Sequence, residues 1–443
     1  MRVKNLVTLS PELRDEQSVF RKITVRLIPL LFGCYLVSYI DRVNVGFAKL
    51  QMMDDLGMSA TAFGFAAGIF FAGYVAFEIP SNLLLLRIGA KKTLARIMLL
   101  WGIASTATAF VTSEFSFFVV RFLLGAFEAG FAPGVLLFLT FWYPKALRAR
   151  MMSYILMGTA VAGIITGPVS GLILTHMNGV AGLDGWRWMF IIEAIPAVIL
   201  GVVVLIWLAD GPDSAKWLNP VELAVVQRAH ARDTDAAPQP KEHSFIGALK
   251  QYRVWMLALI YFTISAAGYV LSFWLPTIVS GLGDFSLVQT GLLTAIPFGA
   301  AAILMPVFAR SSDRRQERGW HIAIIGAVGV SGILIAINTA NPTVALAFFT
   351  VGTVGILGTL PIFWALPSEW LTGSAAAGGI AFVNSVGATG GFVAPYLMGY
   401  LEDRTGSSTT GLYVVSISMA VGLVVVVVLT RLNVTTRQRV AVS

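Results

Sequence analysis

Charged residues are scarce in this chain of 443 residues. They make up 12% of it, whereas 57% of the residues are hydrophobic and the mean hydropathy is +0.79. A soluble protein carries about a quarter charged residues because its surface must be solvated. The shortage argues against a soluble enzyme, a DNA-binding module and a disordered scaffold, and it favours a protein that crosses a membrane many times.

The chain also has little to offer a metal ion. Its single cysteine, Cys34, lies in an apolar run, which argues against a disulfide framework and a cysteine-based metal site. The four histidines are scattered and form no ligand pair at helical spacing. They are His176, His230, His243 and His321. We therefore predict no metal site and no organic cofactor.

Apolar runs long enough to cross a bilayer are abundant. A bilayer core about 30 Å thick needs roughly 20 residues of helix, and we find twelve runs of about that length. Long continuous runs favour helices over the short alternating strands of a barrel. The runs are 27–47, 61–86, 95–113, 115–142, 151–176, 187–209, 254–280, 290–309, 321–339, 343–368, 376–400 and 411–430.

The largest polar break divides these runs into six and six. We predict an all-α polytopic membrane protein with twelve transmembrane helices in two pseudo-symmetric six-helix bundles. The expected parts are a tail at 1–26, a bundle at 27–209, a linker at 210–253, a second bundle at 254–431 and a tail at 432–443.

Inside the linker, the sequence predicts one short amphipathic helix. Asn219 suits its N-cap, Pro220 its first position and Glu222 its first turn. Trp217 and Leu218, just before it, are expected to anchor the linker at the membrane surface.

The distribution of positive charge predicts the topology. Of the 31 lysine and arginine residues, 26 lie in the two tails, the linker and the even-numbered connections. Lys49, Arg187 and Arg404 lie in odd-numbered connections, and Arg42 and Arg121 lie inside spans. The positive-inside rule then places both termini and the linker in the cytoplasm. The net charge of +8 therefore reflects topology, and we expect no nucleic-acid partner.

A constant offset of 227 residues relates the two halves. The basic segments after the second and eighth spans align at this offset, and so do residues of the fifth and eleventh spans. The aligned pairs are Arg87 and Arg314, Lys91 and Arg318, Gly163 and Gly390, and Pro168 and Pro395. Such internal repeats are typical of transporters with a site between the repeats.

The basic segments at 82–92 and 309–318 resemble the signature of the major facilitator superfamily and its weaker copy. The first departs from the usual pattern, with Asn82 for glycine and Leu86 for an acidic residue. Four further motifs resemble the anion:cation symporter branch, and the resemblance covers 27–432. These motifs are 39–48 (YIDRVNVGFA), 78–82 (EIPSN), 121–131 (RFLLGAFEAGF) and 142–144 (WYP). The resemblance implies uptake of organic anions such as tartrate, phthalate, hydroxyphenylacetate or a sugar acid together with protons.

Ionisable residues inside spans are costly, at about 2.5–3.5 kcal/mol each on insertion scales, so each calls for a partner, a water-filled cavity or a function. With residues at span ends set aside, all of them lie in the first half, and counterparts at the 227 offset such as Gly268 and Gly355 are uncharged. This asymmetry indicates recognition and coupling rather than folding. The residues are Asp41, Arg42, Glu78, Arg121, Glu128 and Glu193.

Depth brings several of these charges together. Asp41 lies about 9 Å from the expected outer end of the first span and Arg121 about as far into the fourth, so the two can meet. Glu128 returns to the helix face of Arg121 roughly 10 Å deeper. An arginine fork suits a carboxylate. Burial favours the protonated form of an acid and a nearby arginine opposes it, so an anion that competes for the arginine binds together with a proton.

The resemblance implies a role for each candidate. Asp41 and Glu128 look like the protonation pair, and Arg42 and Arg121 like the anion and relay arginines. The expected cavity contacts are Tyr39, Tyr74, Trp364 and Asn384, and the expected gating residues are Glu78, Arg87, Asp313 and Arg314. The alternatives are an ion-pair network that only docks helices 1 and 4, plain packing for Tyr74 and Trp364, and a structural role for Glu193.

We expect a monomeric multi-pass transporter, not an enzyme, in the inner membrane of a bacterium. Its partners would be the lipid bilayer, protons and a small mono- or dicarboxylate. Two rival functions stay open. One is a proton-driven exporter of drugs or metabolites, suggested by the glycine row at 163–171. The other is a membrane sensor that does not transport.

Overall fold

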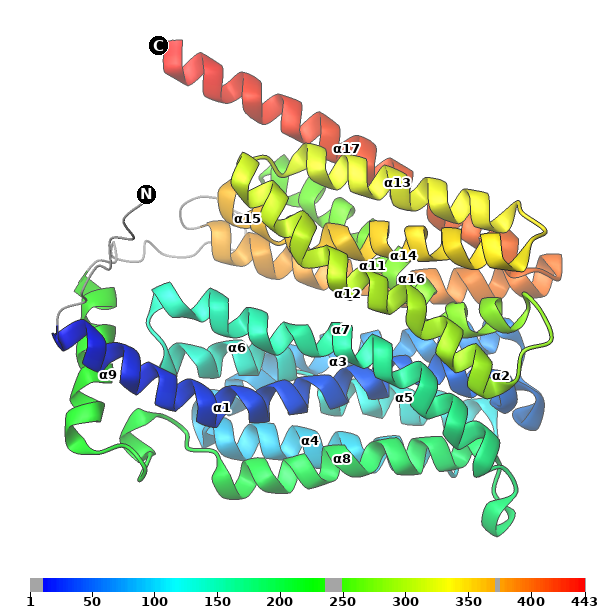
Figure 1. The fold of residues 1–443 in the computed structure, drawn as a ribbon, viewed down its shortest axis with the longest axis horizontal. Helices are drawn as coiled ribbons and strands as arrows, with labels where there is room; N and C mark the ends of the chain where they lie inside the picture. The colour runs from blue at the N-terminus through cyan, green and yellow to red at the C-terminus, as the bar shows by residue number, and fades with distance from the viewer. Residues whose placement is uncertain (1–10, 236–248, 371–374, 443) are drawn as a thin grey trace, which may run out of the picture.

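A computed structural model of the chain describes residues 11–235, 249–370 and 375–442, and its regular elements there are all helical (Figure 1). Three crossings consist of two successive helices. The first half holds α1 (Pro11–Val43) with α2 (Val45–Leu56), α3 (Ala60–Ile88), α4 (Ala90–Thr108), α5 (Glu114–Glu128) with α6 (Phe131–Trp142), α7 (Lys145–His176) and α8 (Gly185–Trp207). The second holds α11 (Tyr252–Ser280), α12 (Leu287–Arg315), α13 (Gly319–Ile337), α14 (Pro342–Phe363) with α15 (Ala365–Trp370), α16 (Ala375–Thr405) and α17 (Ser408–Val442).

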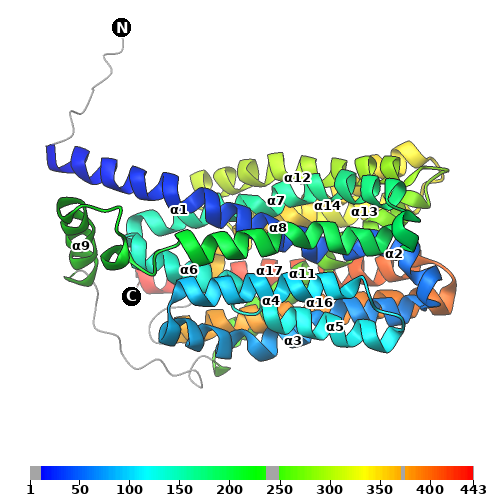
Figure 2. The same cartoon turned by 90° about the horizontal axis from the view of Figure 1, so that it is seen from below.

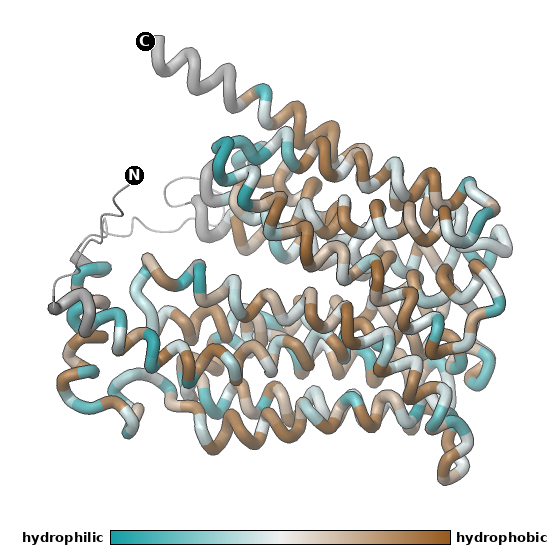
Figure 3. Tube along the Cα trace, viewed as in Figure 1, coloured by the Kyte–Doolittle hydropathy of each residue, from teal (hydrophilic) through white to brown (hydrophobic). Residues whose placement is uncertain are grey.

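The predicted fold class is confirmed. By length and composition, eleven helices or successive pairs in the described part of the chain can span a membrane. The remaining predicted span is α4, which begins with Lys91, Lys92 and Arg96 and packs between α5 and α8. Apolar residues run along the helices and polar residues gather near their ends (Figure 3).

Polar caps start several helices. Ser59 accepts a hydrogen bond from the Ala62 N–H, Ser113 and Ser286 begin capping boxes, and Asn341 accepts bonds from two backbone N–H groups of α14. These caps satisfy donors that a helix leaves free in its first turn.

The first span is longer than predicted. The prediction ended it at 47, where polar residues begin, but α2 continues the helix to Leu56. Lys49 is buried there rather than solvated, because it contacts the second half of the chain. The added length places Asp41 deeper in the bundle than the sequence had indicated.

The two halves form two bundles that meet mainly along two helix pairs, α3 with α16 and α7 with α12, and also through a smaller contact between α2 and α11. Gly64 lies against the backbone of Pro395, and Gly291 lies against Gly167 and Pro168. These two contacts are related by the 227 offset, so the repeat in the sequence is a repeat of interfaces. Glycine lets the paired backbones approach closely.

The glycine row of α7 is explained by this packing. Gly163 faces Phe298, Gly167 faces Gly291 and Gly171 faces Leu287, all on α12. The row therefore shapes the interface between bundles, and it gives no separate indication of antiport.

The described ends of the chain and α9 (Pro220–Asp235) lie at one end of the two bundles, which we call the termini end (Figures 1 and 2). Helix α9 is the predicted linker helix, and Asn219 caps it by accepting a hydrogen bond of 2.8 Å from the Glu222 N–H. Trp217 contacts the first bundle, and its expected contact with the membrane surface stays a prediction. Its ring stacks on Trp142 with 5.5 Å between centroids, so it docks the linker on the first bundle.

Candidate functional site

An ion pair between Arg42 and Glu128 lies at the centre of the first bundle. Arg42 lies fourteen residues from the end of α2 at Leu56, and Glu128 lies fourteen residues from the start of α5 at Glu114. Both are therefore about 21 Å from the same end of the molecule. The Glu128 side chain is 2% exposed, whereas that of Arg42 is 15% exposed, so a solute reaches the pair from the arginine side.

Aromatic rings surround the Arg42 guanidinium. It lies 5.2 Å from the ring centroid of Phe70, 5.6 Å from that of Tyr74 and 5.9 Å from that of Tyr39. Ring faces attract a cation and exclude water from it. The two tyrosines predicted as site contacts, Tyr39 and Tyr74, thus lie beside the arginine, and Phe70 was missed.

The second bundle contributes Tyr269 of α11. Its hydroxyl accepts a hydrogen bond of 3.4 Å from Arg42, and its ring lies 4.4 Å from that of Phe71 on α3. Tyr269 is the counterpart of Arg42 at the 227 offset, so the two residues face each other across the pseudo-twofold relation. Tyr269 was not predicted from the sequence, although the offset alone could have identified it.

Arg121 is fully buried and carries unsatisfied donors. Its guanidinium lies 5.2 Å from the centroid of Phe70, the ring that also faces Arg42. Its Nε donates a bond of 3.4 Å to the Ala66 carbonyl, but Nη1 and Nη2 have no partner among the described residues. Leaving a charged donor buried and unpaired costs more than about 1–3 kcal/mol.

The expected meeting of Arg121 with Asp41 is not observed. Asp41 accepts a hydrogen bond from Ser105 of α4. Its interaction with Arg121 is electrostatic, without a hydrogen bond or a close ion pair. The extension of the first span explains this, because it moves Asp41 away from the level of Arg121. One oxygen of Asp41 and one of Glu128 stay without a partner among the described groups.

Glu193 belongs to a separate network. It accepts a bond of 2.9 Å from Asn44 and one of 2.7 Å from Ser170, so it ties α8 to the first and fifth crossings. Both of its oxygens are satisfied, in contrast to those of Asp41 and Glu128. This arrangement agrees with the structural role predicted for it.

The two cavity contacts predicted from the second half, Trp364 and Asn384, form no bond or ring contact with Arg42 or Glu128 among the described residues. Trp364 lies at the break between α14 and α15, with its ring 4.8 Å from that of Tyr261. Asn384 is half-buried on α16, one turn before Gly387, which lies against the same Tyr261. Tyr261 thus contacts Trp364 and lies against Gly387, and it was not among the residues predicted from the sequence.

The predicted gating residues are not brought together. Glu78 is half-buried on α3 and forms no ion pair with a described residue, and Arg87 is exposed at the end of that helix. Asp313 pairs with Arg318 rather than with Arg314, which is exposed.

The two bundles are separated at the level of the predicted gating residues. On one face of α3, Gly68 is buried against Phe392, whereas Ile79 and Leu86, which follow at helical spacing on that face, are 71% and 63% exposed. Among the described residues, the close contacts between the bundles therefore lie in the half of the molecule opposite the termini, and the structure is open toward the termini end.

A polar lock closes the opposite end, and it was not predicted because span ends had been set aside. Lys49 of α2 pairs with Glu402 of α16 at 3.0 Å and lies 4.5 Å from the ring centroid of Trp274. The Trp274 indole N–H donates to the same carboxylate. Asp403 accepts bonds from the N–H groups of Ala60 and Thr61, so it caps α3 from the other bundle.

Removing one partner of this lock should favour opening of that end. In Glu402→Gln, closing the end would bury Lys49 without a counter-charge, so the closed state is destabilised relative to the open one. We therefore expect a reporter cysteine at Thr290, which is buried, to react with maleimide about tenfold faster than in the protein with Glu402. Cys34 is buried and gives little background. Exposed Asp284, changed to Asn, is the control at the same end. Equal labelling rates in the two variants would show that Glu402 does not hold the end closed.

The sequence matches the Major Facilitator Superfamily over residues 31–395. The chain belongs to this family of membrane transporters, which act on small organic substrates and are not enzymes. It is 44% identical to the putative metabolite transport protein NicT of Pseudomonas putida, over 94% of this chain and 95% of that one. It is also 44% identical to a putative tartrate transporter of Agrobacterium vitis with the same coverage. A quinolone resistance transporter of Acinetobacter baumannii is 41% identical over 92% of this chain and 94% of its own.

Solved structures share the fold. A bacterial homologue of the lysosomal transporter Spinster, described as inward-facing and occupied, matches with a TM-score of 0.75 and 13% identity over 91% of this chain and 96% of that one. A D-xylose-proton symporter matches with a TM-score of 0.71 and 16% identity over 91% and 97%.

Proposed function

We propose that the protein carries an organic carboxylate across the membrane together with protons, by alternating access around Arg42, Arg121, Asp41 and Glu128. The observation that carries this proposal is buried Arg121, whose two terminal nitrogens have no hydrogen-bond partner among the described residues. A network that only docked helices would satisfy its donors. A carboxylate can satisfy both nitrogens at once, because its two oxygens match the guanidinium fork.

Charge balance supports proton coupling. The two arginines and the two ionised acids are neutral together, so each carboxylate group that enters adds one negative charge to a poorly solvated site. A proton taken up by Asp41 or Glu128 restores the balance. Each substrate carboxylate thus favours the uptake of one proton, and a dicarboxylate favours two.

The names of the relatives narrow the substrate class. Two relatives from Agrobacterium vitis are named putative tartrate transporters, and tartrate is a small hydroxylated dicarboxylate. Two arginines that both lie near Phe70 suit such an anion, and the tyrosine hydroxyls beside Arg42 suit its hydroxyl groups. We propose hydroxylated or aromatic carboxylates as the substrates of this chain.

The positive-inside rule supports a cytoplasmic termini end in a bacterial inner membrane. In that orientation the structure is open toward the cytoplasm and closed outside by the Lys49–Glu402 lock. Inward transport would begin when the lock opens and an anion with its protons reaches the arginines.

Export in exchange for protons is the second candidate. It is favoured by the relative named a quinolone resistance transporter, since quinolones are themselves aromatic carboxylic acids. The same arginines could bind such a drug, so the direction of proton movement decides between the two functions.

Proton movement can be measured in proteoliposomes. With tartrate outside, we expect substrate-dependent alkalinisation of the medium and accumulation of labelled tartrate, with xylose as the neutral control. Acidification would indicate exchange instead of symport. The absence of both proton movement and counterflow, across a panel of aliphatic and aromatic acids, would favour a sensor that does not transport.

A further inference from the structure

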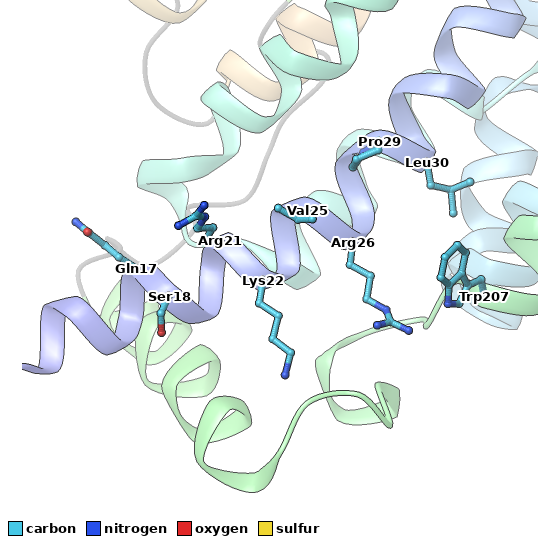
Figure 4. Close-up of a pocket in the computed structure, with 9 residues that line it drawn as sticks. All are labelled: Gln17, Ser18, Arg21, Lys22, Val25, Arg26, Pro29, Leu30 and Trp207. Carbon is cyan, nitrogen blue, oxygen red and sulfur yellow. The ribbon is translucent and has the colours of Figure 1, made fainter.

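A groove of about 920 Å³ runs along the outside of α1 at the termini end, away from the ion pair (Figure 4). Its lining residues come in pairs that recur every four residues, so they form one stripe along the helix. They are Gln17, Ser18, Arg21, Lys22, Val25, Arg26, Pro29 and Leu30 of α1, with Trp207 at the end of α8. Neither the proposed transport site nor the gating residues account for this stripe.

The stripe changes from basic to apolar along its length. Arg21, Lys22 and Arg26 lie toward the start of α1, and Pro29 lies about 12 Å beyond Arg21 but only about 4.5 Å beyond Arg26. Val25 is 68% exposed and Trp207 is 63% exposed, although both are apolar. In this groove, basic residues lie toward the start of α1, and exposed apolar residues lie further into the bundle beside a tryptophan at a helix end. This arrangement is typical of the boundary between lipid headgroups and acyl chains.

Within the described part of the chain, two of the three cations have no anionic partner. Lys22 pairs with Glu222 of α9 at 2.7 Å, and the neighbouring Glu16 pairs with Arg232 at 3.0 Å. Arg21 and Arg26 form no ion pair with any described side chain. Arg26 instead lies 5.0 Å from the ring centroid of Trp217 and 5.6 Å from that of Trp207, and Figure 4 shows it extended toward Trp207.

We propose that this groove binds an anionic phospholipid of the surrounding leaflet. Its phosphate would lie between Arg21 and Arg26, and one acyl chain would lie along Val25, Pro29, Leu30 and Trp207. The groove supplies both requirements of such a lipid: positive charge that no described acid pairs with, and an apolar surface deeper in the bundle for an acyl chain. A soluble anion would use only the first.

Native mass spectrometry of the full-length protein tests the site. After extraction from bilayers with equal amounts of phosphatidylglycerol and phosphatidylcholine, we expect phosphatidylglycerol to be retained preferentially. The double variant Arg21→Gln/Arg26→Gln should bind it about 30-fold more weakly. The matched control Arg228→Gln/Arg315→Gln removes two exposed arginines outside the groove and should retain it like the unmodified protein.

Three results would overturn the proposal. Equal retention of the two lipids by the unmodified protein would do so without any variant, so the test stands even if the double variant folds poorly. An equal loss in the control variant would show a general charge effect. Equally strong binding of glycerol phosphate, which has the headgroup charge but no acyl chains, would make this a site for soluble anions.

Discussion

Glu128→Gln should uncouple transport from protons while leaving exchange of substrate intact. Glutamine keeps the shape of the side chain and a hydrogen-bonding oxygen for Arg42, but it cannot gain or lose a proton. Position 128 is then always neutral, as it is when Glu128 is protonated. We expect net uptake driven by a pH gradient to fall on the order of 100-fold, and counterflow of the same carboxylate to continue within about threefold of the unmodified rate.

Glu193→Gln is the matched control for this variant. It removes another buried acid of the same bundle, but one whose two oxygens accept bonds from Asn44 and Ser170. We expect its proton-driven uptake to persist and its thermal stability to fall. If Glu128→Gln still accumulated substrate against a gradient in response to pH, Glu128 would not be a coupling residue. If counterflow were lost as well, it would be needed for binding instead.

Arg42→Lys separates the ion pair from the arginine fork in the same assay. Lysine retains the charge that Glu128 needs but offers no planar pair of donors to a carboxylate. Retained coupling with weaker substrate binding would agree with the role that we propose for Arg42, and it would distinguish substrate recognition from docking of helices.

The fold could be predicted from the sequence because membrane helices are selected by hydropathy, which is a local property. The twelve spans followed from hydropathy, and the repeat followed from residues that recur at a constant offset of 227. The first span ended too early in the prediction because Lys49 reads as a solvated residue, whereas in the structure Glu402 and Trp274 of the other bundle stabilise it. A contact between residues 353 positions apart leaves no trace in local hydropathy.

The site was predicted only in part, because the charges are visible in the sequence but the contacts between them are not. Charges in apolar runs are conspicuous, so Asp41, Arg42, Arg121 and Glu128 were found, but their pairing depends on depth. An error of nine residues at one helix end exchanged the Arg42–Glu128 pair for a pair between Asp41 and Arg121. Neutral contributors such as Phe70 and Tyr269 do not stand out in an aromatic-rich chain. Only the repeat offset marks Tyr269.

Gly167→Leu should trap the protein with the end opposite the termini open. A side chain at this position would run into the carbonyl of Gly291, and neither backbone can move aside as a flexible side chain would. Closing that end would cost about 3 kcal/mol or more of overpacking, so we expect transport to fall on the order of 100-fold. Val169→Leu adds bulk to an exposed part of the same helix and should transport normally.

Two reporter cysteines distinguish trapping from misfolding. Ser272 is buried at the interface of α2 and α11, and Ile79 is exposed toward the termini end. A trapped protein should expose a cysteine at 272 and protect one at 79, because alternating access closes one end as the other opens. A misfolded protein would expose both.

Gly64→Leu, at the position related to Gly291 by the repeat, should have the same effect through Pro395, since the two interfaces share one geometry. If only one of the two leucine variants trapped the protein, the bundles would rotate about a single interface, and the internal symmetry would not extend to the motion.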